Sequence, residues 1–326
     1  MILVLTEDKD TSANKTIEWF CSLQIPHFRI NLDNANMLEA LEISKDGTTF
    51  QLKYAGQQVE FNEITAVWFR RGYFHFGIHR KIFEQIEDEK TRTTIKNHIR
   101  EECTTLTDFL YYKLGQLKSV NHPNAYNMNK LIALELAQKA GFDIPSSGVF
   151  DHKNKVQRFE KAHGALISKN IQDVISLKVG NFQFGHYTVP IEDLQPLSES
   201  FFYSFFQEKI DKKYELRIFV WENEIYAGAI FSQASDSTQN DSRLNNDFDN
   251  PPRIVPYQVH DDLRNKILRF MEYSALESGS IDIIVTHDLR FIFLEVNPVG
   301  QYDYINVLCN YQIDKKIAES FKYKLS

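Results

Sequence analysis

The first third of the chain alternates apolar runs with amphipathic stretches, which predicts a β-α-β opening. Residues 1–6 (MILVLT) are typical of a buried strand, and residues 12–23 (SANKTIEWFCSL) follow with helical spacing. Ser12 or Asn14 is expected near the N-cap of this helix. The pattern then predicts a strand over 25–33 (IPHFRINLD), a hairpin over 50–61 that turns near Ala55-Gly56, and a buried strand over 66–72 (AVWFRRG).

A long polar stretch from about residue 81 to residue 117 carries apolar residues at helical spacing. It predicts an extended helix with Ile82, Ile86, Ile95, Ile99, Leu106 and Leu110 along one side. Residues 119–127 (SVNHPNAYN) predict a loop and the first domain boundary. Residues 127–145 predict another helix, which Gly141 ends as its C-cap, with Pro145 beyond it.

The second half of the chain predicts paired strands and two helices. We expect a helix over 156–164, a strand over 164–171, a strand from Tyr214 that turns at Glu222-Asn223 into its neighbour, a helix over 261–278, strands over 280–286 (SIDIIVT) and 290–298 (RFIFLEVNP), and a closing helix over 305–325. Between them, residues 235–253 form a polar loop. A loop of this length inside a compact protein is usually functional or mobile.

Composition narrows the class of protein. The hydrophobic fraction of 43% and the charged fraction of 25% are ordinary for a soluble globular chain. The net charge of −7 argues against general nucleic-acid binding, which needs a basic surface. Three widely spaced cysteines without a CxxC pattern indicate neither a zinc site nor a disulfide framework. The sequence shows no signal peptide and no apolar run long enough for a membrane span, so we expect a cytoplasmic protein.

The strand over 291–297 changes character at its end. Four apolar residues (FIFL) precede Glu295 and Asn297, whose side chains share one face about 7 Å apart. If residues 287–290 form a four-residue loop, Thr286 pairs with Phe291 and Asp282 lies directly opposite Glu295. Three oxygen ligands then converge, which suits magnesium completed by phosphate oxygens. The alternative is a group of solvated polar residues at a sheet edge.

Several cations could accompany a bound phosphate. Lys130 lies at the start of a predicted helix and Lys169 at the end of a predicted strand, although each can equally be a surface lysine. Arg217 lies in an apolar strand and needs a partner, which is either Glu215 on the same face or a phosphate. Residues 205–210 (FFQEKI) join two phenylalanines to backbone that can pair with a flat heterocycle.

These segments, taken in order, resemble the ATP-grasp ligases. The resemblance is strongest to the microviridin-type peptide ligases that make graspetides by closing ω-ester or ω-amide rings in a precursor peptide. It spans most of the chain, including WFRRG at 68–72 and PIEDL at 190–194, and its most specific parts are QEKI at 207–210, ELR at 215–217 and LEVNPVGQ at 294–301.

The resemblance implies an α/β (α+β) ATP-grasp fold with a nucleotide between two antiparallel sheets. We expect an N-terminal β-α-β pre-ATP-grasp domain over 1–118, a central lid domain with a leader-peptide site over 119–204, and a C-terminal ATP-grasp domain over 205–326. One departure is that residues 170–182 (NIQDVISLKVGNF) replace a glycine-rich phosphate flap, so the residues that cover the γ-phosphate stay open.

The resemblance also implies roles for single residues. It places ATP at Lys130, Lys169, Glu208, Lys209, Ile210 and Glu215, with the hinge at 208–210 holding adenine and Glu215 the ribose. Asp282, Glu295 and Asn297 would hold Mg²⁺, with two ions expected. Arg217 and Arg243 would contact the phosphate or acyl phosphate. Asp241 is a candidate base, or alternatively a loop turn residue.

The implied reaction is carboxylate activation on a peptide. An Asp or Glu side chain would form an acyl phosphate, which a Thr or Ser hydroxyl, or a Lys amine, then attacks. Glu192 and Asp193 would bind an arginine of the leader helix, or alternatively are helix N-terminal acids favoured by the dipole. The expected partners are a precursor peptide and a second copy of the chain, with no nucleic acid and no membrane. The competing interpretations are a ligase that joins an amino acid to a peptide or small acid, and a nucleotide-binding regulatory module.

Overall fold

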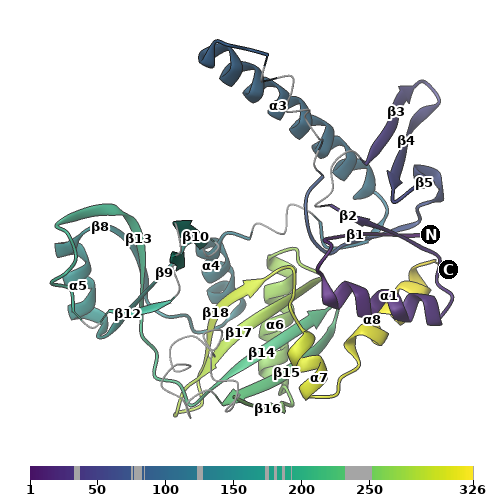
Figure 1. Cartoon of the computed structure of the whole chain (residues 1–326). Coiled ribbons are helices and arrows are strands. Elements are labelled where there is room, and N and C mark those ends of the chain that lie inside the picture. Colours follow the sequence, from purple (N-terminus) through teal and green to yellow (C-terminus); the bar gives the residue numbers. More distant parts are fainter. Residues whose placement is uncertain are drawn as a thin grey trace. The chain divides into compact units, whose positions relative to one another are not determined.

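The chain forms two compact units in the computed structural model (Figure 1). The structure describes residues 1–32, 37–74, 76, 83, 85–122, 128–172, 176–179, 182–185, 188–191, 193–231 and 252–325. Unit 1 comprises Met1–Tyr126 and Gln312–Ser326, and unit 2 comprises Asn127–Tyr311. The last fifteen residues therefore group with the N-terminal part of the chain, whereas the sequence analysis placed them in the C-terminal domain.

Unit 1 is built on a parallel sheet in the order β2-β1-β6-β7. Its elements are β1 (Ile2–Thr6), α1 (Thr11–Ser22), β2 (His27–Asn31), β3 (Leu38–Ser44), β4 (Gly47–Tyr54), β5 (Gln57–Glu60), the 3-10 helix η1 (Phe61–Glu63), β6 (Ala66–Phe69), α3 (Glu89–Leu114), β7 (Lys118–Val120) and α8 (Ile313–Leu325). All five residues of β1 are buried, because its two faces are both covered. The predicted β-α-β opening is confirmed.

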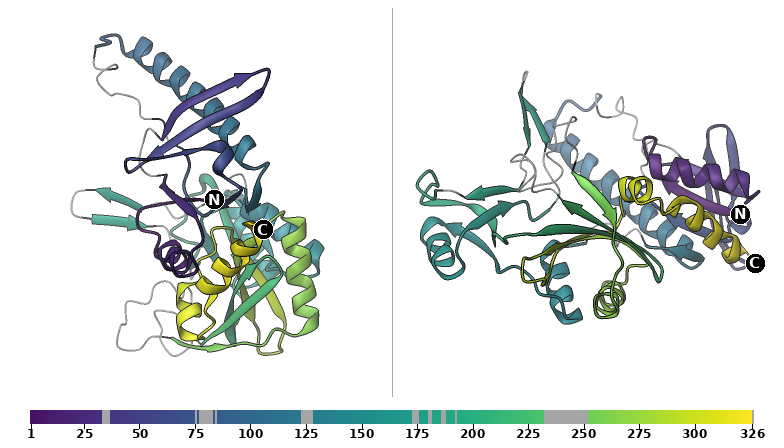
Figure 2. Two further views of the ribbon diagram at one scale, coloured as in Figure 1. Left: turned by 90° about the vertical axis from the view of Figure 1, so that its right-hand side faces the viewer. Right: turned by 90° about the horizontal axis from the view of Figure 1, so that it is seen from below.

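Different elements cover the two faces of the parallel sheet. On one face, α1 and α8 lie side by side (Figure 2), and Phe321 contacts both Phe20 and Trp68 at ring-centroid distances of 5.8 and 6.0 Å. On the other face, the antiparallel sheet β3-β4-β5 and the C-terminal end of α3 share a core with β1, β2 and β6. The hairpin that turns at Ala55-Gly56 joins β4 to β5, as predicted.

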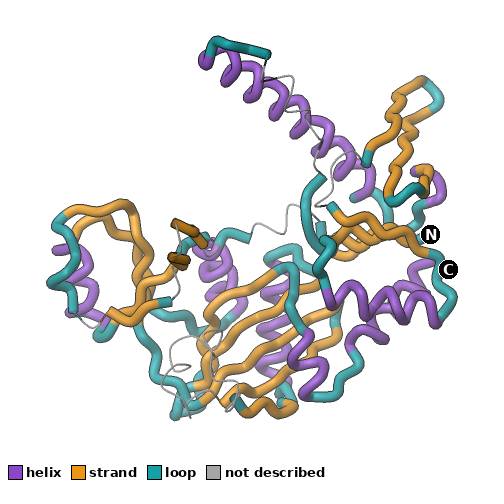
Figure 3. The backbone as a smooth tube through the Cα atoms, in the orientation of Figure 1, coloured by secondary structure: helices purple, strands orange, loops and turns teal. Residues whose placement is uncertain are grey.

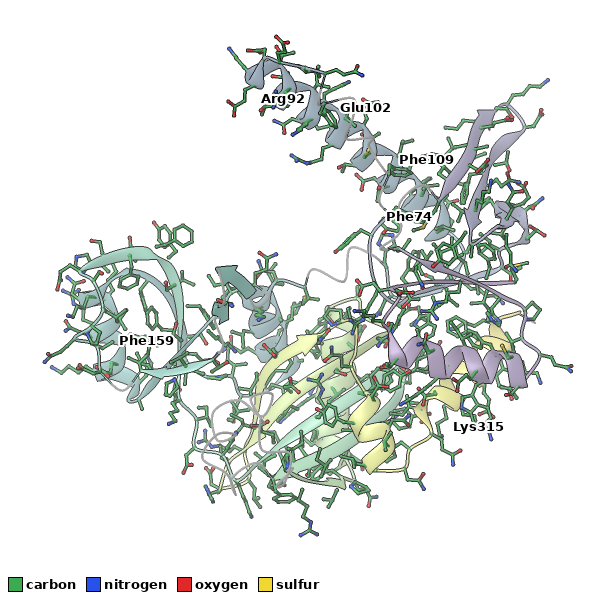
Figure 4. The ribbon with its side chains drawn as sticks, viewed as in Figure 1. Phe74, Arg92, Glu102, Phe109, Phe159 and Lys315 are labelled. Carbon is green, nitrogen blue, oxygen red and sulfur yellow. The ribbon has the colours of Figure 1, made fainter. Side chains whose placement is uncertain are left out.

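The long helix α3 has an anchored end and an extended end. Its buried residues are Leu110, Tyr111 and Leu114, all in the last two turns, and the Phe74 N–H donates to the Tyr111 hydroxyl at 3.1 Å. Figure 4 shows Arg92 and Glu102 on the part of the helix that extends away from the sheet of unit 1. The helix begins at Glu89, eight residues after the start of the stretch that predicted it.

The start of α1 depends on a buried carboxylate that the sequence analysis missed. Asp10, not Ser12 or Asn14, is the N-cap, and its side chain accepts from the Ala13 N–H at 3.1 Å. Arg70 Nε and Arg71 Nε, from the end of β6, lie 3.1 and 3.4 Å from Asp10 Oδ2. The cap is therefore decided by tertiary contacts that helix propensity alone does not contain.

Unit 2 contains two larger antiparallel sheets. Its elements are α4 (Lys130–Ala140), β8 (Ser147–His152), α5 (Lys153–His163), β9 (Leu166–Lys169), β10 (Ser176–Val179), β11 (Phe182–Gly185), β12 (Val189–Ile191), β13 (Ser200–Glu208), β14 (Tyr214–Trp221), β15 (Glu224–Phe231), β16 (Arg253–Pro256), α6 (Asp261–Tyr273), β17 (Ser278–Val285), β18 (Phe291–Asn297) and α7 (Asp303–Leu308). The first sheet has the order β12-β9-β13-β8, and the second has the order β16-β15-β14-β17-β18. Figure 3 shows the strands of both sheets in orange.

Each sheet of unit 2 has one face covered by helices. Helix α5 packs on the first sheet, where its buried Val156 forms a cluster with Leu166 and Phe206. Phe159 of this helix is labelled in Figure 4, and its ring centroid lies 5.2 Å from that of Phe150. Helices α4 and α6 cover the second sheet, where the Phe270 ring lies 4.8 Å from the Phe293 ring. The opposite faces of the two sheets remain available for a site.

The predicted closing helix is two helices. The helix α7 ends at Leu308 and α8 begins at Ile313, and between them Asn310 and Gln312 have left-handed φ values of 54° and 56°. A continuous helix cannot contain such residues. The amphipathic spacing continues across the break, which is why the pattern predicted a single helix.

We predict that Asp10→Asn destabilises the chain in a pH-dependent way. Burial raises the pKa of Asp10, but Arg70, the Ala13 N–H and Arg71 together outweigh it, so the pKa lies below its usual value. The stabilisation is therefore present above the unfolded-state pKa of about 4 and is lost as the pH falls through the lower folded-state pKa. Asp10→Asn should lower the free energy of unfolding by about 3 kcal/mol at pH 7 and by progressively less below pH about 4, measured by urea unfolding.

A matched control is Asp88→Asn. Asp88 is the exposed N-cap of α3 and accepts from the Thr91 N–H, whereas Asp10 is buried beside Arg70 and Arg71. This variant should change stability by no more than about 0.5 kcal/mol at pH 7. Equal losses for the two variants would mean that Asp10 acts only as a helix cap.

Candidate functional site

A pocket lies in unit 2 against the open faces of its two sheets. The sheet β12-β9-β13-β8, called the central sheet below, contributes Ile167 and Lys169 from β9 and Gln207 from β13. Residues 208–210 line the pocket where the chain leaves this sheet. The five-stranded sheet contributes residues of β14, β15, β17 and β18, and Thr188, Lys212, Gln301 and Tyr304 also line the pocket. The pocket therefore has the position that the family resemblance predicts for a nucleotide between two antiparallel sheets.

A row of charged residues crosses the five-stranded sheet at this pocket. Arg217 on β14 is the register partner of Asp282 on β17, and Asp282 is the partner of Glu295 on β18. The predicted position of Asp282 opposite Glu295 is confirmed. The three side chains lie on one face because directly paired residues in a sheet point the same way.

The register arises differently from the prediction. Phe291 pairs with Val285, not with Thr286, so the pairing begins one residue out of step. A β-bulge at Leu294 restores the step and brings Glu295 opposite Asp282. Leu294 and Glu295 then both line the pocket. A hairpin-loop argument alone does not contain this bulge.

Arg217 pairs with Asp282, and not with Glu215 as the sequence analysis considered. Arg217 Nη1 donates to both carboxylate oxygens of Asp282 at 2.7 Å, and Nη2 donates to the Gln301 carbonyl at 3.4 Å. Burial lowers the pKa of Arg217, but Asp282, Tyr304 and Glu295 raise it above its usual value. The site therefore keeps a permanent positive charge at the inner end of the acidic row.

The row contains two carboxylates, Asp282 and Glu295, and one arginine. Desolvation raises the pKa of Asp282, Arg217 lowers it, and Glu295 raises it again, so the pKa lies above the ordinary range. Glu215 adds to the same repulsion. Carboxylates that disfavour one another's ionisation are the arrangement that a divalent cation stabilises.

Asn297 follows Glu295 on the same strand but is already used by the backbone. It is the register partner of Ser280, and its Oδ1 accepts from the Val299 N–H at 3.0 Å. One lone pair of this oxygen is thus occupied, and the second remains for a ligand. Among the described residues, no three His, Cys, Asp or Glu side chains form a metal-binding group, so a metal here would need Asn297 or phosphate oxygens.

The two lysines that were predicted to bind phosphate lie at the start of a helix and at the end of a strand. Lys130 is the first residue of α4, and its Nζ lies 3.7 Å from Glu295 Oε2 and donates to the Gln172 carbonyl at 3.0 Å. Lys169 ends β9 and lines the pocket, with its Nζ 5.7 Å from the centre of the Phe205 ring. Lys130 therefore lies beside Glu295 and is not among the described residues that line the pocket, whereas Lys169 lines it.

The segment 208–210 offers its backbone to the pocket. The Glu208 N–H and the Lys209 N–H donate to Ser146 and Ala165 carbonyls at 2.8 Å, and Glu208 Oε2 accepts from the Ser146 N–H. Within the described part of the chain, the Lys209 carbonyl and the Ile210 N–H have no hydrogen-bond partner. The two groups belong to one trans peptide and point in opposite directions, so only one of them can face a ligand at a given edge of the segment.

Glu215 is joined to a lysine that sequence reasoning did not single out. Lys212 Nζ forms an ion pair and hydrogen bond with Glu215 Oε1, and both residues line the pocket. Lys212 is only 6% exposed. The only sequence signal for this ion pair was that a lysine and a glutamate lie three residues apart. Because Lys212 precedes the strand, no helix or strand periodicity predicts that the two side chains meet.

The segment after Asn297 is part of the family motif, but the sequence alone offered no physical explanation for Gly300, Gln301 and Tyr302. Gly300 has a φ of +67°, and a Cβ there would lie 2.8 Å from Phe219 Cε2. The Gln301 carbonyl accepts from Arg217 and from the Ser280 hydroxyl. Tyr302 is fully buried, and its ring centroid lies 4.5 Å from that of Phe219. The VGQY sequence is therefore a turn that holds an acceptor at the arginine.

The remaining predicted residues divide into two groups. Arg243, Asp241 and Glu192 lie outside the described residues. Asp193 is exposed, and its Oδ1 accepts from the Gln195 N–H at 2.8 Å in a turn. No helix starts at Asp193 in the described residues that follow it, so its interpretation as a helix N-terminal acid is wrong.

Comparisons with solved structures match nearly the whole chain. An RiPP-associated ATP-grasp ligase from Chryseobacterium gregarium, solved with ADP and a leader and core peptide, is 27% identical with a TM-score of 0.83 over 99% of this chain and 96% of that chain. The macrocyclase MdnC from Microcystis aeruginosa, bound with precursor peptide MdnA, is 24% identical with a TM-score of 0.78 over 98% of both chains. The ATP-grasp ligase PsnB, with minimal precursor, Mg and ADP, is 18% identical with a TM-score of 0.70 over 99% and 97%.

Comparisons by sequence alone are negative. No family model matches the chain, and no curated protein matches it. A search of the described helices for one long and apolar enough to cross a membrane finds none.

We predict that Gly300→Ala destabilises unit 2 more than a glycine change without a close neighbour. An alanine at φ +67° meets the Phe219 ring, so the strain of the left-handed backbone and the clash add. The free energy of unfolding should fall by about 2 to 4 kcal/mol. Gly141→Ala is the control, because Gly141 also has a positive φ (98°) but only ordinary contacts, and it should cost about 1 kcal/mol. Similar losses in thermal unfolding would contradict the packing argument.

Proposed function

We propose that this chain, which belongs by its fold to the ATP-grasp ligases as the sequence resemblance indicated, is an ADP-forming ligase that closes rings in a ribosomal precursor peptide. The observation that carries the proposal is the match over 99% of the chain to a RiPP-associated ligase solved with ADP and peptide. The charged row of Arg217, Asp282 and Glu295 at a pocket between two sheets supports it independently.

The nucleotide would be ATP, with its base at the hinge. The backbone of Lys209 or Ile210 would contact the adenine edge, and Glu208 would hold the hinge by accepting from the Ser146 N–H. Glu215, oriented by Lys212, would accept from the ribose hydroxyls. Lys130, beside Glu295, and Lys169, on the pocket wall, would bind the phosphates.

The charged row fits magnesium. Asp282 and Glu295 would hold it, with the second lone pair of Asn297 Oδ1 and phosphate oxygens completing an oxygen shell, and two ions are expected. When bound, magnesium would neutralise charge on the transferring phosphoryl group. It would also relieve the carboxylate repulsion that raises the pKa of Asp282.

The residues of this chain would position two successive displacements. An oxygen of a peptide Asp or Glu carboxylate attacks the γ-phosphorus, and the bond to ADP breaks, which gives an acyl phosphate. A Thr or Ser hydroxyl then attacks the acyl carbon, loses its proton and displaces phosphate, which gives an ester. Arg217, held by Asp282 and the Gln301 carbonyl, would stabilise the charge that develops on the phosphoryl oxygens.

The peptide partner follows from the same relatives. We propose that a leader helix binds the central lobe, where Asp193 is exposed and Glu192 precedes it. Arg243 as an acyl-phosphate ligand, Asp241 as a base, a homodimer and a cytoplasmic location stay predictions from the sequence and its resemblance. They are compatible with the proposed reaction and are not needed to explain the pocket.

The proposal predicts a defined mass change in a peptide. The chain, incubated with ATP, Mg²⁺ and a Thr- and Asp/Glu-rich peptide encoded beside its gene, should remove one water per ring and release one ADP per ring, measured by mass spectrometry and an ADP assay. A mass increase by one amino acid would instead favour a ligase that joins a free amino acid. Bound nucleotide that is never hydrolysed would favour a regulatory module.

Glu295→Gln should abolish ring closure without unfolding the chain. The substitution keeps the shape of the side chain and removes one charge from the metal position, so ring formation should fall by a factor of about 100 or more and ADP binding should lose its dependence on Mg²⁺. Glu224→Gln, on the exposed start of β15, is the matched control and should leave both quantities unchanged. Wild-type turnover in Glu295→Gln would refute the magnesium assignment.

A further inference from the structure

Tyr304 places an aromatic ring in the pocket, next to Arg217. It is the second residue of α7, and the Arg217 guanidinium carbon lies over its ring, 5.9 Å from the ring centre. A guanidinium at this distance is attracted by the electrons of the ring face. Asp282 and the Gln301 carbonyl bind the guanidinium along its edges, so the ring adds a contact to one of its faces.

Helix α7 is fixed against the five-stranded sheet, which gives the Tyr304 ring a defined position. Ile305, the next residue, is fully buried, and a Cβ at Gly228 on β15 would lie only 3.0 Å from its Cγ2. The helix also contacts β16. Because the backbone on the inner side of α7 is held this closely, Tyr304 stays beside Arg217.

Tyr304 and Arg217 both line the pocket but differ in their exposure to water. Arg217 is 9% exposed, whereas Tyr304 is 36% exposed. The ring thus contacts the guanidinium and also reaches solvent, and its removal would open the guanidinium to water. Tyr304 is therefore a barrier between solvent and the position at which Arg217 would hold a phosphoryl group.

Water at this position would compete with the proposed ring closure. The acyl phosphate is a mixed anhydride, and a water oxygen can attack its acyl carbon in place of the peptide hydroxyl. The bond from this carbon to the phosphate oxygen then breaks, the water loses a proton, and the original carboxylate and free phosphate result. ATP would be consumed without a ring, which is the kind of side reaction that exclusion of water prevents.

We infer that the Tyr304 ring shields the acyl phosphate at Arg217 from water and so couples the use of ATP to ring closure. The inference rests on the proposed function, since it needs an acyl phosphate in this pocket. The shielding is a property of the ring and not of the hydroxyl, because the ring is the part that covers the guanidinium. Phenylalanine should therefore serve as well as tyrosine.

The test compares ADP release with ring formation in Tyr304→Ala and Tyr304→Phe. Each variant is incubated with ATP, Mg²⁺ and the precursor peptide, and ADP and dehydrated peptide are measured together. The wild-type chain and Tyr304→Phe should release one ADP per ring, whereas the ratio should rise severalfold in Tyr304→Ala because water consumes the intermediate. ADP release without peptide should be the same in all three proteins.

Val307→Ala is the matched control on the same helix. Val307 lies three residues after Tyr304, is 63% exposed and is not among the described residues that line the pocket. Its substitution should leave the ratio of ADP to rings unchanged. The dissociation constant of ADP with Mg²⁺, measured by calorimetry, should keep its wild-type value in every variant, which separates shielding from a loss of nucleotide binding.

Three results would overturn the inference and leave the ligase proposal standing. The first is an unchanged ratio in Tyr304→Ala with both rates lowered, because the ring would then only position Arg217. The second is a raised ratio in Tyr304→Phe, because the hydroxyl would then be responsible. The third is an equal rise of ADP release without peptide, because water would then attack the γ-phosphate and not the acyl phosphate.

Two further results are also decisive. If Tyr304→Ala does not fold, Tyr304→Leu replaces it, and a ratio that stays at one ADP per ring in this ringless variant would overturn the inference. Absence of peptide-dependent ADP release by the wild-type chain would overturn the proposed function and the inference together.

Discussion

The ion pair of Arg217 and Asp282 is the interaction on which the site depends. Two adjacent strands of the five-stranded sheet place these residues opposite each other, with both carboxylate oxygens 2.7 Å from one guanidinium nitrogen. The pair holds a positive charge in a buried strand and a carboxylate next to Glu295. Without it, the buried arginine would be uncompensated, which is costly, and the acidic row would have no fixed inner end.

Two local irregularities turn an ordinary antiparallel sheet into this site. The bulge at Leu294 shifts the register by one residue, so that Glu295 rather than Leu294 lies opposite Asp282. The turn at Gly300 then brings the Gln301 carbonyl to the second nitrogen of Arg217. The bulge lies in the middle of β18 and the turn follows the end of this strand, and each of them orients a side chain or a carbonyl toward the charged row.

Much of the architecture could be predicted because hydrophobic spacing reports which faces are covered. Three features are as expected: the fully buried strand β1, the paired strands β14 and β15 with their turn at Glu222, and the C-cap at Gly141. Two predictions were wrong: the N-cap residue of α1, and the single closing helix that the structure divides into α7 and α8. The first depends on Arg70 and Arg71 from a distant strand, and the second on two left-handed residues whose types permit a helix.

The sequence by itself determined the residue types of the site and the approximate alignment of Asp282 with Glu295, because strand periodicity is a local property of the chain. Only the tertiary structure decided the partner of Arg217, the pairing of Lys212 with Glu215 and the orientation of the Gln207 amide. The partner of Arg217 depends on which strands are neighbours, the Lys212–Glu215 pair depends on the conformation of the chain just before β14, and the orientation of the Gln207 amide, which donates to Ser147 Oγ, depends on single hydrogen-bond directions. Spacing along one strand says which side chains share a face, but the residue across from them comes from another part of the chain.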